Sequence, residues 1–246
     1  MKKKIKITFI ALIAALYMSG CIITGFTGTT NTVTGTGETE NYVFTVGAYS
    51  GIKAEGAVNI NYYSSPSNIV TLTVQPNLLE YFKIEVTGND LVIKTTRNIK
   101  PGAGKFPTLT VSVPVLNRLE ISGICDFITY NKITADSFTL SQSGAGSGRI
   151  ELDVNSLLID MSGAGRMDLS GKADTVNYKL SGAGDIDSLS LEARDSTINF
   201  SGAGSINVNS TEYLRIVASG AGSILYRGSP QIDLNRSGFI SITRVD

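Results

Sequence analysis

The stretch Ser181-Gly182-Ala183-Gly184 is one copy of a tetrapeptide that recurs through the C-terminal half of this 246-residue chain. Full copies begin at Ser143, Ser162, Ser181, Ser201 and Ser219, and degenerate copies begin at Ser122 and Ser237. Successive serines are 21, 19, 19, 20, 18 and 18 residues apart. A fixed period near twenty residues is typical of a solenoid, in which each repeat buries its core only against its neighbours.

The residues between the tetrapeptides indicate β-structure. In residues 175–181, the apolar side chains of Val176, Tyr178 and Leu180 alternate with polar ones. Alternation with a period of two residues predicts strands, and runs this short and so often broken by glycine do not predict helices. The 3.6-residue period of helical repeats is absent. The repeat is therefore expected to be a coil of β-strands.

Stacked coils place equivalent residues above one another at about 4.8 Å. This stacking predicts an internal ladder of apolar side chains: Phe127, Met167, Ile186, Ile206 and Ile224. Residues 146–150 of the copy at Ser143 add residues to this pattern, which predicts a bulge or a wider loop there. Gly-Ala-Gly suits a tight corner, because glycine accepts positive φ and a close neighbouring backbone. The fold class is thus all-β: a parallel β-helix (solenoid) of about 18–21 residues per coil, right-handed by the usual chirality of parallel crossovers.

The N-terminus has the pattern of an export signal. Residues 1–6 are basic, and residues 7–17 are apolar over a length typical of a signal peptide. Met18-Ser19-Gly20-Cys21 comes next and resembles a bacterial lipobox, with methionine in place of the usual leucine three residues before the cysteine. We expect residues 1–20 to be a lipoprotein signal peptide and Cys21 to carry the lipid. The alternative is an ordinary secretory peptide.

Composition divides the remainder of the chain. Residues 22–40 hold eight threonines and four glycines, so residues 21–40 are expected to be a flexible tether. Residues 41–105 are a less regular β-rich part that caps the solenoid, and residues 106–246 are the β-helix. In the cap, residues 87–90 predict a hairpin turn and residues 76–81 predict one helical turn. Residues 55–58 resemble a degenerate copy of the repeat corner.

Charge and residue types exclude several classes of function. The leader holds four lysines and no acid, which leaves 17 basic and 21 acidic residues in the mature chain and a net charge of −4. This balance disfavours a nucleic-acid partner. The chain has no histidine, which excludes Ser-His-Asp, Cys-His and histidine-metal sites. Cys125 is expected to be a small buried residue rather than a reactive thiol.

The serial Ser-Gly-Ala-Gly corners, together with several short motifs, resemble the head GIN domain family, named as a putative auto-transporter adhesin head. The motifs are residues 51–58, 77–81, 113–116 and 226–230, and the resemblance covers about residues 42–244. It implies a right-handed parallel β-helix on an exported, often lipid-anchored protein of the cell envelope. The family has no established activity, so the resemblance supplies no catalytic residue and no cofactor.

Two groups of residues are candidates for a ligand surface. Tyrosine rings stack on sugars, and Tyr62 and Tyr63 are adjacent, so one of them should point outward. Asp168, Asp185 and Asp187 should lie close together if coils stack in register, with Arg166 beside Asp185. Paired carboxylates could hold a hard cation, but a solvated surface with an Arg166–Asp185 ion pair is the simpler interpretation, and no metal is expected.

These patterns favour a non-catalytic envelope lipoprotein that acts in adhesion or polysaccharide binding. Its partners would be the membrane, through the N-terminal lipid at the outer membrane or cell surface, and a polysaccharide or an envelope protein. One alternative is a carbohydrate-active enzyme, a metal-assisted polysaccharide lyase using the carboxylates. Another is a structural, self-associating envelope component.

Overall fold

The structure, a computed structural model, describes residues 32–246. The predicted signal peptide, Cys21 and most of the tether lie outside the described residues. Residues 31–246 form one compact unit. Its hydrophobic core runs without interruption from Tyr49 to Ile240. All described long-range packing lies within this unit, which is therefore a self-contained folding unit.

The unit begins with short strands and two short 3₁₀ helices. These are β1 (Thr32–Thr34), β2 (Glu40–Phe44), β3 (Gly51–Glu55), β4 (Asn59–Ser64), β5 (Ile69–Val74), η1 (Pro76–Tyr81), β6 (Phe82–Thr87), β7 (Asp90–Thr95), β8 (Asn98–Lys100), η2 (Gly102–Gly104) and β9 (Thr108–Val113). The predicted hairpin joins β6 to β7, with Gly88 at a φ of +62°. The predicted helical turn is η1. Antiparallel pairs β2–β5, β5–β9 and β6–β7 distinguish this part from the C-terminal half of the unit.

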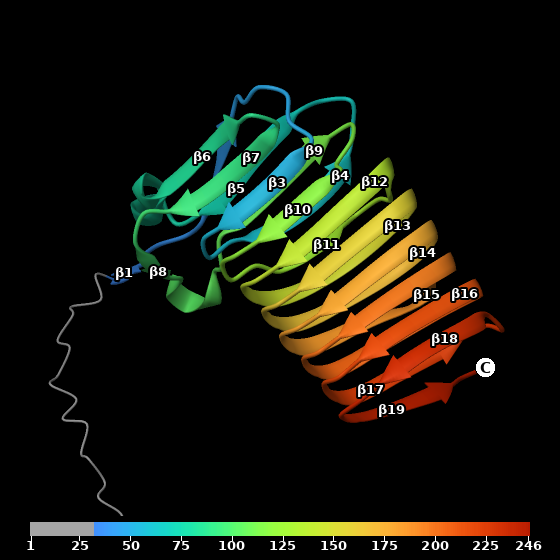
Figure 1. Cartoon of the computed structure of the whole chain (residues 1–246). Helices are drawn as coiled ribbons and strands as arrows, with labels where there is room; N and C mark the ends of the chain where they lie inside the picture. The colour runs from blue at the N-terminus through green and yellow to red at the C-terminus, as the bar shows by residue number, and fades with distance from the viewer. Residues whose placement is uncertain (1–31) are drawn as a thin grey trace, which may run out of the picture. The chain divides into compact units, whose positions relative to one another are not determined.

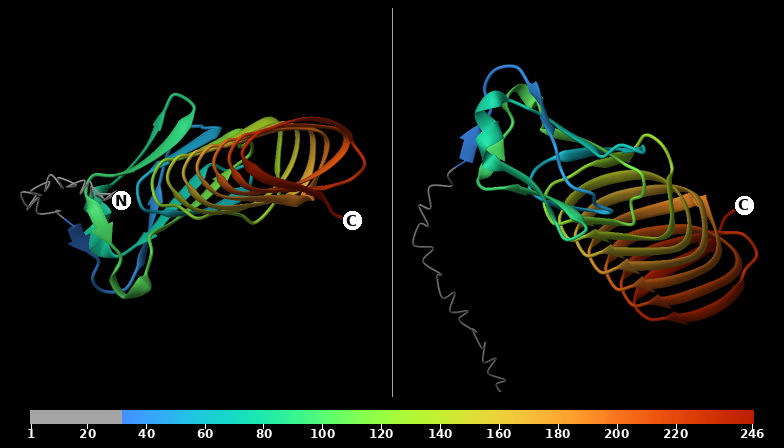
Figure 2. Two further views of the ribbon diagram at one scale, coloured as in Figure 1. Left: turned by 60° about the horizontal axis from the view of Figure 1, so that its bottom comes forward. Right: turned by 90° about the horizontal axis from the view of Figure 1, so that it is seen from above.

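The remaining strands form stacked parallel coils. They are β10 (Arg118–Ile121), β11 (Phe127–Thr129), β12 (Ile133–Gln142), β13 (Ala145–Met161), β14 (Ala164–Leu180), β15 (Ala183–Phe200), β16 (Ala203–Ala218), β17 (Ala221–Arg227), β18 (Gln231–Arg236) and β19 (Phe239–Arg244). Figure 1 shows them in succession from β10 to β19. The parallel β-solenoid that the sequence predicts is confirmed. Figure 2 shows the coils from two further sides.

Each coil has two faces that meet at the Ser-Gly-Ala-Gly corner. The first face begins with five strands in the spatial order β6, β7, β3, β10 and β12. It continues with the C-terminal parts of β13–β16 and ends with β18. On the second face, the order is β2, β5, β9, β4 and β11, continued by the N-terminal parts of β13–β16, β17 and β19. Strands β3 and β4 are the first coil, so the corner at residues 55–58 is a true member of the series.

The corners stack through backbone hydrogen bonds. The amide of each corner alanine donates to a glycine carbonyl of the preceding coil, as in Ala164 to Gly144 and Ala183 to Gly163, both 3.0 Å. A side chain on either corner glycine would collide with a backbone carbonyl oxygen of the preceding coil, as at Gly163 and Gly165, and Gly165 also has a φ of +148°. The alanine side chain, in contrast, points to solvent. Stacking therefore dictates glycine at these two positions of the tetrapeptide.

The predicted internal ladder is confirmed, and Gly148 is an additional member of it. Met167, Ile186, Ile206 and Ile224 are in register and buried, and Phe127 joins them through Gly148. The bulge or wider loop expected after Ser143 is wrong, because β13 and β14 pair in unbroken register from Ala145 to Val154. Gly148 occupies the ladder position, and the Met167 sulfur lies where its side chain would be. Register shifts between these long strands lie later, after Asp168, Ser188 and Ala193.

Part of the segment expected to be tether belongs to the folded unit. β1 pairs in parallel with β8 from Thr32 to Thr34. The side chain of Asn77 holds the chain near this strand, accepting from the Thr36 amide and donating to the Thr34 carbonyl, both at 2.9 Å. The buried Gln75 side chain donates to the Gly37 carbonyl and accepts from the Gly102 amide. Residues 32–37 are therefore held against the cap by hydrogen bonds.

Candidate functional site

The two adjacent tyrosines of β4 point to opposite sides of the strand. Tyr62 is fully buried, and its ring packs against Phe127 at 6.4 Å between centroids. It is therefore removed from the candidate ligand surface. Tyr63 points outward and stacks on Tyr130, with centroids 4.7 Å apart and ring planes 7° from parallel. Tyr130 is 56% exposed, so the pair presents aromatic surface to solvent.

Tyr130 is a residue that sequence reasoning did not single out. It lies beside Tyr63 because β11 and β4 pair with a constant offset of 67 residues, as in Asp126 with Asn59 and Asn131 with Ser64. The same offset separates the corner glycines Gly56 and Gly123. Alignment of the degenerate corners would therefore have placed Tyr130 opposite Tyr63.

Polar side chains and one exposed apolar side chain, Ile69, border the tyrosine pair on the outside of the second face. Ser112 lies opposite Tyr63, and Ile69 lies opposite Ser112. One row further along the strands are Asn61, Thr110 and Thr71. Hydroxyl and amide groups beside an exposed aromatic ring are a common means of binding polar, ring-shaped ligands such as sugars.

The carboxylates lie on the same outer surface. Asn61 of β4 pairs with Ile128, Ile128 with Arg149, Arg149 with Asp168, and Asp168 with Asp187. Asp185 is two residues from Asp187 and points to the same side. Four of the five predicted residues are thus brought onto one surface, which we call the tyrosine–carboxylate surface. It comprises Tyr63, Tyr130, Arg149, Arg166, Asp168, Asp185 and Asp187.

Arg166 joins two of these carboxylates. Its backbone lies opposite Asp185, as expected, but its guanidinium donates to Asp168 at 2.7 Å and to Asp187 at 2.9 Å. Asp185 instead accepts a hydrogen bond from the Ser205 hydroxyl at 2.5 Å. The expected Arg166–Asp185 pair is therefore wrong in its partner. The hydrogen bond with Asp168, and then the charge of that carboxylate, raises the pKa of Arg166.

This arrangement bears on the alternative of a metal-assisted lyase. The guanidinium lies between Asp168 and Asp187, where a cation bridging the two carboxylates would have to bind. Within residues 32–246, no group of three or more acidic or cysteine side chains is placed to hold a metal ion. An open pocket of about 350 Å³ borders the cluster and also contacts Arg149, Ser170 and Ser190. Most of the side chains that line this pocket are charged or carry a hydroxyl group.

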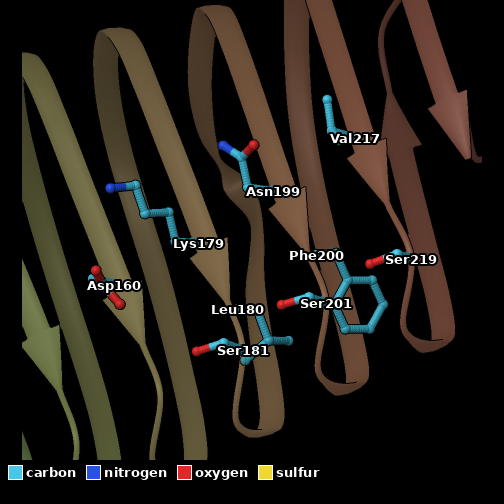
Figure 3. A pocket seen from close by; sticks show the side chains of 9 residues that line it. All are labelled: Asp160, Lys179, Leu180, Ser181, Asn199, Phe200, Ser201, Val217 and Ser219. Carbon is cyan, nitrogen blue, oxygen red and sulfur yellow. The ribbon is translucent and has the colours of Figure 1, made fainter.

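A second open pocket lies on the first face, beside the corners. It has a volume of about 380 Å³. Figure 3 shows the corner serines Ser181, Ser201 and Ser219 along one side of it. Asp160, Lys179, Asn199 and Val217, from four successive coils, also line it. The lining is mixed and its polar groups come from separate coils.

Cys125 is buried, as expected. Burial, with a smaller contribution from the charge of Asp126, raises the pKa of its thiol to about 12. The thiol is therefore protonated at neutral pH and is a poor nucleophile.

The described residues include no helix long and apolar enough to cross a membrane.

Comparison with known proteins identifies the fold and the family. A putative adhesin from Bacteroides fragilis has 25% sequence identity and a TM-score of 0.83, and the alignment covers 87% of this chain and all of that one. A putative adhesin from Parabacteroides distasonis has 20% identity and a TM-score of 0.65 over the same shares of the two chains.

A putative lipid binding protein from Parabacteroides distasonis has 20% identity and a TM-score of 0.64, with 87% of this chain and all of that chain covered. No curated protein matches the sequence. The family model described as "Putative auto-transporter adhesin, head GIN domain" matches residues 48–230. That match spans most of the chain and nearly all of the solenoid, and the chain belongs to the head GIN domain family.

Proposed function

We propose that this protein is a non-catalytic, adhesin-like module of the bacterial cell envelope that binds polysaccharide on its tyrosine–carboxylate surface. The observation that carries the proposal is the exposed Tyr63–Tyr130 stack, set among hydroxyl and amide side chains. Aromatic rings bury the apolar faces of sugars, and neighbouring polar groups hydrogen-bond their hydroxyls. The family description and the related adhesins support an adhesin-like role.

The solenoid suits this role because its outer surface repeats from coil to coil. The tyrosine pair and the Arg166 cluster lie on the same face: Tyr63 is on β4, Tyr130 directly follows β11, and β13 separates β11 from β14, which carries Arg166. At about 4.8 Å per strand, the strand of Arg166 is roughly 10 Å from that of Tyr130 and roughly 15 Å from that of Tyr63. A chain of sugar units is long enough to contact both, and contacts shared over several units allow each to be weak.

Attachment to the membrane through a lipid on Cys21 is part of the proposal. The lipobox-like residues 18–21 support it. A lipid there would leave residues 22–31 as a spacer before β1, whose pairing with β8 fixes the chain to the cap. This order of anchor, spacer and rigid body would hold the ligand surface away from the membrane.

The test of the proposal uses residues 31–246, incubated with a panel of bacterial and host polysaccharides with and without calcium. Both retention of the protein and cleavage of the polysaccharide are measured. The proposal predicts retention without cleavage and without a calcium requirement.

Calcium-dependent release of unsaturated or reducing ends would contradict it and favour the lyase. Absence of both retention and cleavage would also contradict it, and would favour a protein partner.

A further inference from the structure

The last coil of the described structure has open edges. β18 forms its ladder with β16, and β19 forms its ladder with β17. Within residues 32–246, neither strand has a ladder on its other edge. Figure 1 shows both strands at the end of the stack of coils away from β6 and β7. Unpaired edges with free amide and carbonyl groups are templates for pairing with another chain.

The interior of the solenoid is also uncovered at this end. Ile232 and Leu234 continue the ladders of Leu214 and Ile216, which are fully buried one coil earlier. In the last coil the same positions are 41% and 46% exposed. A further coil placed here would cover them, and the burial of this apolar surface would favour association.

Two arginines occupy inward positions in this coil. One ladder has only uncharged side chains, each at most 2% exposed, until its last member; it runs Ile121, Gln142, Met161, Leu180, Phe200, Ala218 and then Arg236. A second ladder runs Ser188, Val208, Tyr226 and then Arg244. In both ladders, the charged side chain is thus the one in the last coil, which no described strand covers.

Both arginines contact neutral groups, so no described carboxylate compensates their charges. The Arg236 guanidinium donates to the Ile240 carbonyl at 3.3 Å, across the last corner. The Arg244 guanidinium donates to the Ser229 hydroxyl at 2.8 Å. Neither arginine takes part in any ion pair found between described residues. Among the described residues, each guanidinium therefore has a neutral hydrogen-bond partner and no carboxylate partner.

We propose that Arg236 and Arg244 prevent the solenoid from joining end to end with a second copy of this chain. In a two-fold antiparallel pairing of β18 that sets Leu234 opposite its own copy, each Arg236 would lie over Ile232 of the other copy. Burying a guanidinium against apolar side chains without a carboxylate is strongly unfavourable. Inward-pointing charges are a known protection of open strand edges.

The proposal is tested by returning the two positions to the residues of the preceding coil. The variant R236A/R244Y of residues 31–246 places alanine above Ala218 and tyrosine above Tyr226. Sedimentation velocity over a hundredfold range of protein concentration is expected to show a monomeric wild type and a variant that dimerises. The control K172A/K179Y removes two exposed charges from the middle of the solenoid and should remain monomeric.

Adding Leu234→Lys to the dimerising variant places a new charge at the centre of the end and should restore the monomer. Circular dichroism and urea unfolding establish that each variant is folded, and Arg236→Ala alone serves if the double variant is not. Three results would overturn the proposal: a wild type that already associates through this end, a folded arginine variant that stays monomeric, or dimers that persist with Leu234→Lys.

Discussion

Substitution of Gly165 by alanine tests the physical basis of the repeat. Gly165 combines two constraints: a φ of +148°, and a position where a Cβ would overlap the carbonyl oxygen of Gly146 in the preceding coil. That oxygen belongs to the backbone and cannot rotate away. Relief of the overlap requires the two coils to separate at the corner, next to the hydrogen bond from Ala164 to Gly144.

The expected loss in the free energy of unfolding is the sum of the contributions from the steric overlap and from the backbone conformation. Overpacking in a closely packed region costs about 1–3 kcal/mol, and an alanine held in a backbone region reserved for glycine costs about 1–3 kcal/mol. Gly165→Ala is therefore expected to lower the free energy of unfolding by about 2–6 kcal/mol. This is a large share of the roughly 5–15 kcal/mol typical of a folded domain.

Two further variants separate the terms. Gly163 meets the Gly144 carbonyl in the same way, but its φ lies outside the glycine-favoured region, so Gly163→Ala should lose only the packing term of about 1–3 kcal/mol. The exposed neighbour Ala164→Ser should change stability by less than about 0.5 kcal/mol. Urea unfolding of residues 31–246, monitored by circular dichroism, gives the three values. A Gly165→Ala variant as stable as Ala164→Ser would refute the stacking argument.

Three further predictions address titration, the charged cluster and the anchor. Burial raises the pKa values of the Cys125 thiol and the Tyr49 hydroxyl to about 12; both groups are held neutral in the folded state, so their contribution to stability is complete below about pH 9 and should be lost between about pH 9 and 12. Unfolding midpoints that stay constant across that range would contradict this. Arg166→Ala should lower stability by less than about 1 kcal/mol, because its carboxylate pairs are solvent-exposed; a larger loss in urea unfolding would show a structural role. Cys21→Ser in the full chain should abolish incorporation of labelled fatty acid in bacteria, and a variant that still incorporates it would exclude Cys21 as the anchor.

The sequence predicted those parts of the fold that depend on stacking identical positions. The corner glycines and the ladder at Ile186 come from a period that is visible in the residues themselves. The bulge or wider loop expected near Gly148 failed because a ladder position can be filled from the next coil, here by Met167. Residues 146–150 therefore add nothing to the repeat: they pair one to one with the next coil, and only the small side chain of Gly148 made the ladder position hard to recognise.

The other departures arise from interactions that leave little trace in residue patterns. The pairing of β1 with β8 depends on backbone hydrogen bonds and on Asn77 and Gln75, which are distant in sequence. The partners of Arg166 were missed because register fixes which backbones are neighbours, whereas a long side chain also reaches residues two positions away. The alternation of inward and outward residues could predict that one of Tyr62 and Tyr63 is exposed, but not which one.

The central claim is that polysaccharide binds at the tyrosine–carboxylate surface. The most direct test measures the affinity of residues 31–246 for a retained polysaccharide in the wild type, in Tyr63→Ser/Tyr130→Ser, and in Lys179→Ala/Asn199→Ala as a matched control in the pocket of the first face. A sugar bound over a tyrosine ring buries apolar surface of that ring, and burial of a large apolar side chain is worth roughly 1.5–3 kcal/mol, so the tyrosine variant should bind at least about tenfold more weakly and the control should bind as the wild type does. Unchanged binding by the tyrosine variant, or a loss confined to the Lys179/Asn199 variant, would contradict the claim.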